Sequence, residues 1–241
     1  MPTSQSNQIS KIVNALIAIN PESLLDVGPG FGKYGVLARE YLELWDGRDE
    51  YSFKRRMDAV EAFEGYVTPL HRYIYNNVYV GDITKLIDTL DTSYDLVMMI
   101  DVLEHFDKKV GQELLNKMLE KHGGVLVSIP RNVQHQGHAF HNEFEEHKAA
   151  WKTSELAELA PHISFPTAAS IIVYLSRKHD VKKINKEQKT KNRYRFFSSN
   201  PLLLKLWYLP DKLRGKKHKD HEHNHDHEHS HEGHDHSNHT H

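Results

Sequence analysis

The chain has no cysteine among its 241 residues, which excludes a disulfide framework and a zinc site built on thiolates. It also has no apolar run that approaches the length of a membrane-spanning helix. Residues 1–10 are polar and contain no apolar segment of the kind that a secretory signal needs. These absences favour a globular protein of a reducing compartment, and we expect a cytoplasmic location.

Charge is distributed unevenly along the chain, although the formal net charge is only −2. Residues 1–176 contain 16 Lys and Arg against 24 Asp and Glu, residues 177–219 contain 15 against 3, and residues 220–241 contain none against 6. These three regimes predict three parts. They are a domain over residues 1–176 that begins with a helix within 1–20, a basic extension over 177–217 and a histidine-rich tail over 218–241.

Strands and helices are predicted to alternate through the domain. Runs of mainly apolar residues predict strands over residues 23–27, 57–61, 78–80, 94–100 and 125–129. Apolar residues at helical spacing predict helices over 7–19, 32–44, 68–75, 109–121 and 154–159. Residues 163–165 and 169–175 are expected to form a terminal antiparallel hairpin. The alternation predicts an α/β fold, a doubly wound sheet with helices on both faces.

The first predicted strand ends in the most informative stretch of the sequence, residues 24–32. An apolar run is followed by Asp26 and then by three glycines at alternate positions, Gly28, Gly30 and Gly32. Glycine allows a positive φ and lets the backbone approach a ligand closely. The GxGxxG fingerprint of dinucleotide-binding sheets would need glycine where Lys33 stands.

An acidic residue lies at the carboxyl end of each of the first four predicted strands: Asp26, Glu61, Asp82 and Asp101. In open α/β sheets, ligands bind beyond the carboxyl ends of the strands, at the point where the strand order reverses. Asp101 directly follows the apolar residues 96–100, where a carboxylate is costly to place without a partner. We therefore expect the four carboxylates to surround one site.

Residues 23 to about 176 resemble class I S-adenosylmethionine (SAM) methyltransferases of the bacterial group that modifies glycans or small metabolites. The resemblance rests on the glycine motif, on Val80-Gly81-Asp82-Ile83 and on residues 95–106, which read DLVMMIDVLEHF. It implies a Rossmann-like seven-stranded sheet and SAM as cofactor. Glu61 would accept hydrogen bonds from both ribose hydroxyls, Asp82 would receive the adenine amino group, and Ile83 would cover the ring. The implied cofactor-binding set is Asp26, Gly28, Gly30, Gly32, Glu61, Ala62, Asp82, Ile83 and Asp101.

Other interpretations of these residues stay open at this point. The glycines could form an ordinary tight turn, and Glu61 could be a solvated charge at a strand end. A turn-rich insertion over residues 45–56 lengthens the usual spacing before Glu61, so Glu64 is an alternative to it. Asp82 could simply cap the following helix, because aspartate is a favoured N-cap.

The resemblance implies methyl transfer from SAM to a small-molecule or glycan acceptor, with oxygen as the expected methylated atom. Asp101, His105, His141 and His147 are the candidate catalytic residues, and the general base is left unassigned. His105 could instead orient its loop, and the histidines after residue 130 could be structural parts of a lid. A divalent ion on His138, His141 and Glu143 is a further alternative.

The basic extension combines lysines and arginines with aromatic and leucine residues, especially over 190–217. That composition is typical of segments that associate with anionic lipid, which would place the protein at the inner face of the membrane. A C-terminal helix packed on the domain explains it equally well. Residues 202–206 are too apolar for a simple phosphate-binding arm, which argues against nucleic acid as a partner.

The tail over residues 218–241 contains eleven histidines and no apolar residue, so burial cannot fold it and we predict disorder. Dense imidazoles beside carboxylates bind Zn²⁺ or Ni²⁺. The predicted ligands are His221, His223, His225, His227, His229 and His231. Two further functions are therefore considered, a metal-buffering protein that works through its tail and a catalytically silent SAM-binding module. The sequence gives no indication of the oligomeric state.

Overall fold

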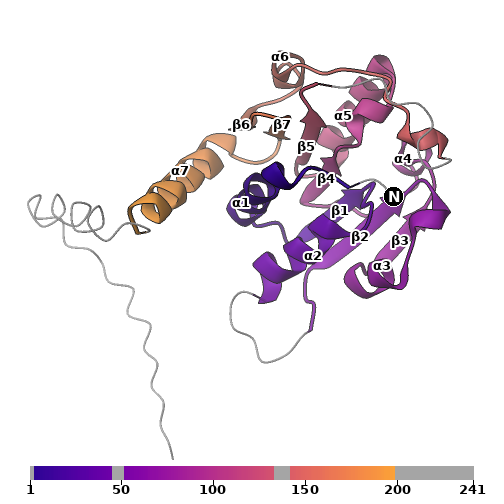
Figure 1. Ribbon diagram of the computed structural model, residues 1–241, viewed down its shortest axis with the longest axis horizontal. Helices are drawn as coiled ribbons and strands as arrows, with labels where there is room; N and C mark the ends of the chain where they lie inside the picture. Colours follow the sequence, from indigo (N-terminus) through magenta and orange to yellow (C-terminus); the bar gives the residue numbers. More distant parts are fainter. Residues whose placement is uncertain (1–2, 45–51, 133–141, 199–241) are drawn as a thin grey trace, which may run out of the picture. The chain divides into compact units, whose positions relative to one another are not determined.

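A computed structural model describes residues 3–44, 52–132 and 142–198 (Figure 1). Contacts between residues divide the chain into two units, 1–193 and 194–241, and the first contains the whole sheet. The strands are β1 (Ser23–Val27), β2 (Arg56–Glu61), β3 (Asn77–Val80), β4 (Leu96–Ile100), β5 (Val125–Pro130), β6 (His162–Pro166) and β7 (Ser170–Leu175). The α-helices are α1 (Ile9–Ile19), α2 (Lys33–Arg39), α3 (Pro69–Ile74), α4 (Ile83–Leu86), α5 (Lys108–Lys121), α6 (Thr153–Ala157) and α7 (Val181–Ser198). Among the described helices, none is both long enough and apolar enough to cross a membrane.

The seven strands form one sheet in the order β3-β2-β1-β4-β5-β7-β6. β1 pairs in parallel with both β2 and β4, while β7 runs antiparallel to β5 and to β6. The chain builds outward from β1 to β3 and then crosses to β4 on the other side, so the strand order reverses between β1 and β4. This topology confirms the predicted doubly wound α/β sheet with a terminal antiparallel hairpin.

Helices cover both faces of the sheet, as predicted (Figure 1). α1, α2 and α3 pack on one face together with Leu24, Leu96 and Met98 of the central strands. α4, α5 and α6 pack on the other face with their neighbours Leu25 and Val97. Because successive side chains of a strand point to opposite faces, continuous apolar runs are what a sheet covered on both sides requires.

The predicted element bounds differ from the structure mainly after the glycine loop. The helix expected over residues 32–44 is an α-helix only to Arg39, and Glu40–Leu44 continue it as a π-helical turn. The strand expected over 94–100 begins at Leu96. Asp95 precedes the strand, and its Oδ2 accepts hydrogen bonds from the backbone nitrogens of Glu22 and Ser23, 2.8 and 3.2 Å away.

Arg39 lies buried at the end of α2 and forms an ion pair with Glu43, 2.6 Å away. Its Nε donates to the carbonyl of Ile74 at 2.9 Å, and its other nitrogens reach Arg55 O and Asn76 Oδ1. We expect Arg39→Met to lower the free energy of unfolding by about 3–5 kcal/mol, because Glu43 then stays buried without its cation. Urea denaturation measures this, and a loss below about 1 kcal/mol would contradict the assignment.

Candidate active site

A cavity of about 520 Å³ opens at the carboxyl ends of β1, β2 and β4. Its wall includes the four carboxylates expected there, Asp26, Glu61, Asp82 and Asp101, together with Ala62 and Ile83. The volume lies in the range of sites that hold a small molecule or cofactor. The structure thus brings together acidic residues that follow four different strands.

The glycine loop forms one side of this cavity. Gly28 and Gly30 line it with φ angles of 65° and 56°, in the left-handed region that favours glycine. A Cβ atom on Gly28 would lie 2.6 Å from Cγ2 of Val102. Gly32, also predicted to contact cofactor, is not among the lining residues and instead occupies the N-cap position of α2.

Asp26 is buried at the end of β1, and the hydroxyl of Tyr75 donates a hydrogen bond to its Oδ2 at 2.6 Å. Burial raises the pKa of Asp26 to about 7, and the hydrogen bond from Tyr75 opposes part of that rise. A cationic or hydroxyl-bearing ligand in the cavity would stabilise the ionised carboxylate. Without such a ligand, the ionised form is costly.

Glu61 ends β2 and is also buried, with its Oε1 accepting from the backbone nitrogen of Phe63 at 3.0 Å. Its pKa is raised to about 7, chiefly by burial and also by the nearby carboxylates of Glu145 and Asp26. Glu64, the alternative, is exposed in the short helix η3 (Glu64–Tyr66) and is not among the lining residues. The geometry therefore favours Glu61 over Glu64 as the residue that faces a ligand.

Asp82 both lines the cavity and caps α4. Its Oδ1 accepts hydrogen bonds from the backbone nitrogen of Thr84 at 2.9 Å and from the Thr84 hydroxyl at 2.8 Å. The capping alternative therefore describes Asp82 in this structure. A contact of Asp82 with adenine stays a prediction.

Asp101 lies just beyond β4 with a φ of 56°, which is strained for a residue other than glycine. Its Oδ2 accepts from Nε2 of Gln8 at 2.7 Å, and its Oδ1 lies 3.2 Å from Oγ of Ser128. Burial raises the pKa of Asp101, whereas these two hydrogen bonds lower it. Asp101 is thus held by two partners while it faces the cavity.

The N-terminal segment forms part of the cavity wall, through Thr3, Ser4 and Gln5. Nζ of Lys33, at the start of α2, donates to the carbonyl of Ser4 at 2.8 Å. Gln8 then continues the attachment through its hydrogen bond to Asp101. Residues that precede the sheet in sequence therefore help to enclose the site.

His105 and His147 both line the cavity, and their ring centroids lie 5.0 Å apart. His105 belongs to the short helix η4 (Leu103–His105), and its Nδ1 lies 3.1 Å from the carbonyl of Glu146. That contact supports the alternative in which His105 orients the loop. Burial lowers the pKa of His105, which favours the neutral imidazole. His141, the fourth catalytic candidate, lies outside the described residues, as do His138 and the histidine-rich tail.

Several residues of the site were not predicted from the sequence, among them Gln8, His71, Tyr75 and Glu104. His71 is buried, and its Nε2 contacts the carbonyl of Gly30 at 2.8 Å while its Nδ1 accepts from the Thr68 nitrogen. A carbonyl only accepts, so Nε2 carries the proton and the imidazole holds the glycine loop. The partners of Gln8 are 93 and 120 residues away, and no local pattern signals such contacts.

No protein-family model matches this chain, and neither does any curated protein. Among solved structures, it is similar to an O-methyltransferase family protein from Burkholderia thailandensis, with a TM-score of 0.52 and 11% identity. That match covers 73% of this chain and 57% of the other, so this chain spans little more than half of that protein. It is also similar to the N-terminal domain of EvdMO1 in the presence of SAH and D-fucose, with a TM-score of 0.52 and 12% identity, over 72% and 84% of the two chains. The chain has the class I SAM-dependent methyltransferase fold.

The raised pKa of Asp26 predicts a specific pH dependence of stability. The carboxyl is easier to ionise in the unfolded chain than in the folded protein. The free energy of unfolding of the ligand-free protein therefore falls as pH rises from about 4 to about 7. Asp26→Asn can still accept the hydrogen bond from Tyr75. We expect its free energy of unfolding to equal that of the parent at pH 4 and to exceed it at pH 8 by about 2–4 kcal/mol. Urea denaturation at the two pH values measures this, and equal stabilities at pH 8 would contradict the burial argument.

Proposed function

We propose that this protein is a SAM-dependent methyltransferase that acts on a hydroxyl of a small molecule or glycan. The observation that carries the proposal is the convergence of four strand-end carboxylates and a glycine loop on one cavity. The class I methyltransferase fold is consistent with it, but fold alone does not assign an activity.

The residues of the cavity fit SAM. Gly28 lines the cavity with backbone atoms alone, and Glu61 is a carboxylate suited to accept from two ribose hydroxyls. Asp26 is the acidic group at the turn where a cationic part of the cofactor would be placed. Ile83 offers an apolar surface for the adenine ring beside Asp82. The buried carboxylates, which are costly when ionised alone, gain donors when such a ligand binds.

When bound, SAM supplies a methyl group that its sulfonium already makes electrophilic. The chain then has to align an acceptor oxygen with that methyl group and receive or release the acceptor's proton. Asp101, His105 and His147 are the described ionisable groups in the cavity that we propose for these tasks. The O–CH₃ bond forms as the S–CH₃ bond breaks, and the hydroxyl proton leaves to a base or to solvent.

The proposed acceptor is a small molecule or glycan because the cavity continues into an exposed apolar rim. Phe31 is 59% exposed, and Phe144 and Val110 also remain partly exposed beside the cavity. Exposed aromatic faces suit a ring or a sugar better than an extended charged polymer. The names of the two similar structures, an O-methyltransferase family protein and a domain studied with D-fucose, favour oxygen as the methylated atom.

Isothermal titration with SAM tests the proposal, and its pH dependence adds a sharper criterion. Glu61 has a pKa of about 7 without ligand, and hydroxyl donors of SAM favour its ionised form. We therefore expect affinity to be flat above pH 7 and to fall below it, by up to about tenfold per pH unit. Absence of SAM binding at pH 8 would contradict the proposal, and affinity that rises on acidification would contradict the role of Glu61.

Two further functions have distinct tests. A catalytically silent module would bind SAM but give no methylated product with any hydroxyl acceptor in a panel of sugars and phenols. A metal buffer would bind zinc through the tail and show no affinity for SAM. The proposed membrane association of residues 190–217 predicts co-sedimentation with anionic liposomes that is lost when those residues are deleted.

A further inference from the structure

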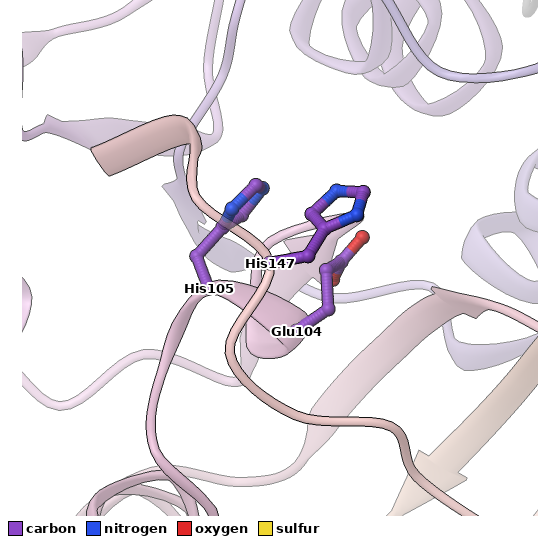
Figure 2. A group of neighbouring side chains, drawn as sticks. All are labelled: Glu104, His105 and His147. Atoms are coloured by element: carbon purple, nitrogen blue, oxygen red, sulfur yellow. The ribbon is translucent and has the colours of Figure 1, made fainter. Parts of the chain in front are cut away.

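Glu104, His105 and His147 place three metal-binding atoms within 4.8 Å of one another inside the cavity. Figure 2 shows the three side chains next to one another, with the Glu104 carboxylate beside the His147 ring. Glu104 and His105 come from the loop after β4, and His147 comes from the segment after β5. Two imidazoles and one carboxylate are a donor set that proteins use for Zn²⁺ while a further position stays open.

Glu104 gives an independent indication of a missing ligand. The residue is 1% exposed, and its Oε2 has no hydrogen-bond partner among residues 3–44, 52–132 and 142–198. Burial raises the pKa of Glu104 the most, and repulsion from the carboxylates of Asp101 and Glu145 also raises it. A buried carboxylate oxygen that has no donor and lies near two other carboxylates is costly, and a cation would stabilise it.

The backbone holds one ring nitrogen of His105 in place. Its Nδ1 faces the carbonyl of Glu146 at 3.1 Å, and because a carbonyl only accepts, Nδ1 carries the proton. The lone pair is therefore on Nε2. Metal-binding histidines commonly donate their other N–H to a carbonyl in this way, which fixes the ring and its tautomer.

The backbone holds the two halves of the cluster together. The backbone nitrogens of Lys148 and Ala149 donate to the carbonyl of Glu104 at 2.8 and 3.1 Å. These bonds fix the segment that carries His147 against η4, so the three ligands are placed before any ion binds. Preorganisation of this kind reduces the conformational cost of binding.

We propose that Glu104, His105 and His147 bind a divalent transition-metal ion of the Zn²⁺ type in the cavity. This role of the ion rests on the proposed function: the ion would take an oxygen of the acceptor as a further ligand and lower the pKa of that hydroxyl. The hydroxyl proton then passes to solvent, and the oxygen accepts the methyl group as the S–CH₃ bond breaks.

The test uses the full-length chain with its eleven tail histidines replaced by asparagine, so that the tail does not mask the site. After treatment with a chelator, the protein is titrated with Zn²⁺ by calorimetry and with Co²⁺ by visible absorption. We expect one equivalent to bind, with a Co²⁺ spectrum characteristic of nitrogen and oxygen ligands. Glu104→Gln and His147→Gln should each weaken metal binding at least about 100-fold. Loss of a residue that hydrogen-bonds to a metal ligand costs about 10–100-fold in affinity, and loss of the ligand itself should cost more.

His162→Gln is the matched control, because His162 is an exposed histidine at the start of β6 and should bind the ions like the parent. Thermal unfolding and SAM affinity of each variant show whether the protein remains folded. No binding by the parent, or equal binding by Glu104→Gln and the parent, would overturn the metal site. SAM binding without metal binding refutes this inference alone, and metal binding without SAM binding refutes the proposed function alone.

Discussion

Glu61→Gln should weaken SAM binding about 100-fold at pH 8. The carboxylate ends β2 inside the cavity, where it is placed to accept from two ribose hydroxyls. An amide keeps one acceptor oxygen but presents an NH₂ group where the second hydroxyl must donate. Charge-assisted hydrogen bonds to carboxylates contribute about 1.5–3 kcal/mol each, which corresponds to the expected factor. Calorimetric titration of parent and variant measures it.

Two features make this experiment decisive. Glu64→Gln removes a carboxylate three residues away that is exposed and is not among the lining residues, so it should bind SAM like the parent. Glu61→Gln should also remain folded, because burial of Glu61 raises its pKa to about 7 and its charge destabilises the ligand-free protein at pH 8. Equal SAM affinities of the Glu61 and Glu64 variants would refute the role assigned to Glu61.

Gly28→Ala is expected to have the second largest effect, on both stability and cofactor binding. The residue has a φ of 65°, and an added Cβ would lie 2.6 Å from Val102 Cγ2. The left-handed conformation costs an alanine about 1–2 kcal/mol, and crowding adds about 1–3 kcal/mol. Because the loop must move to relieve the contact, SAM affinity should fall at least about 100-fold. Urea denaturation and calorimetry measure the two effects.

The double variant Gly28→Ala with Val102→Ala separates the two causes. It removes the contact with Val102 but leaves the positive φ, so part of the stability should return while the conformational cost stays. Val102→Ala alone supplies the reference for the cycle. If Gly28→Ala bound SAM within threefold of the parent, the dependence of SAM binding on the geometry of the glycine loop would be refuted.

The fold was predictable because its signals are local. Strands such as Leu96–Ile100 are apolar throughout, which a sheet covered on both faces requires, and the glycines after Asp26 mark a tight turn. The positions of Asp26, Glu61, Asp82 and Asp101 were predictable for the same reason. Once the strands are parallel, residues that follow them meet at one edge of the sheet.

Contacts that depend on distant pairing were not predictable. Nothing near Tyr75 indicates that its hydroxyl will reach Asp26, 49 residues away. Glu104 lies inside a motif that the sequence analysis quoted, yet its burial and its missing hydrogen-bond partner appear only in three dimensions. Asp82 shows a different limit of prediction. The same aspartate caps α4 and lines the cavity, so the sequence could not decide between the two interpretations.

The attachment of Gln8 to Asp101 and Ser128 has a consequence for how the protein is made. Gln8 is synthesised before both of its partners, which follow 93 and 120 residues later. Gln8 therefore cannot complete these contacts until β5 has been synthesised, so this part of the site forms late in translation.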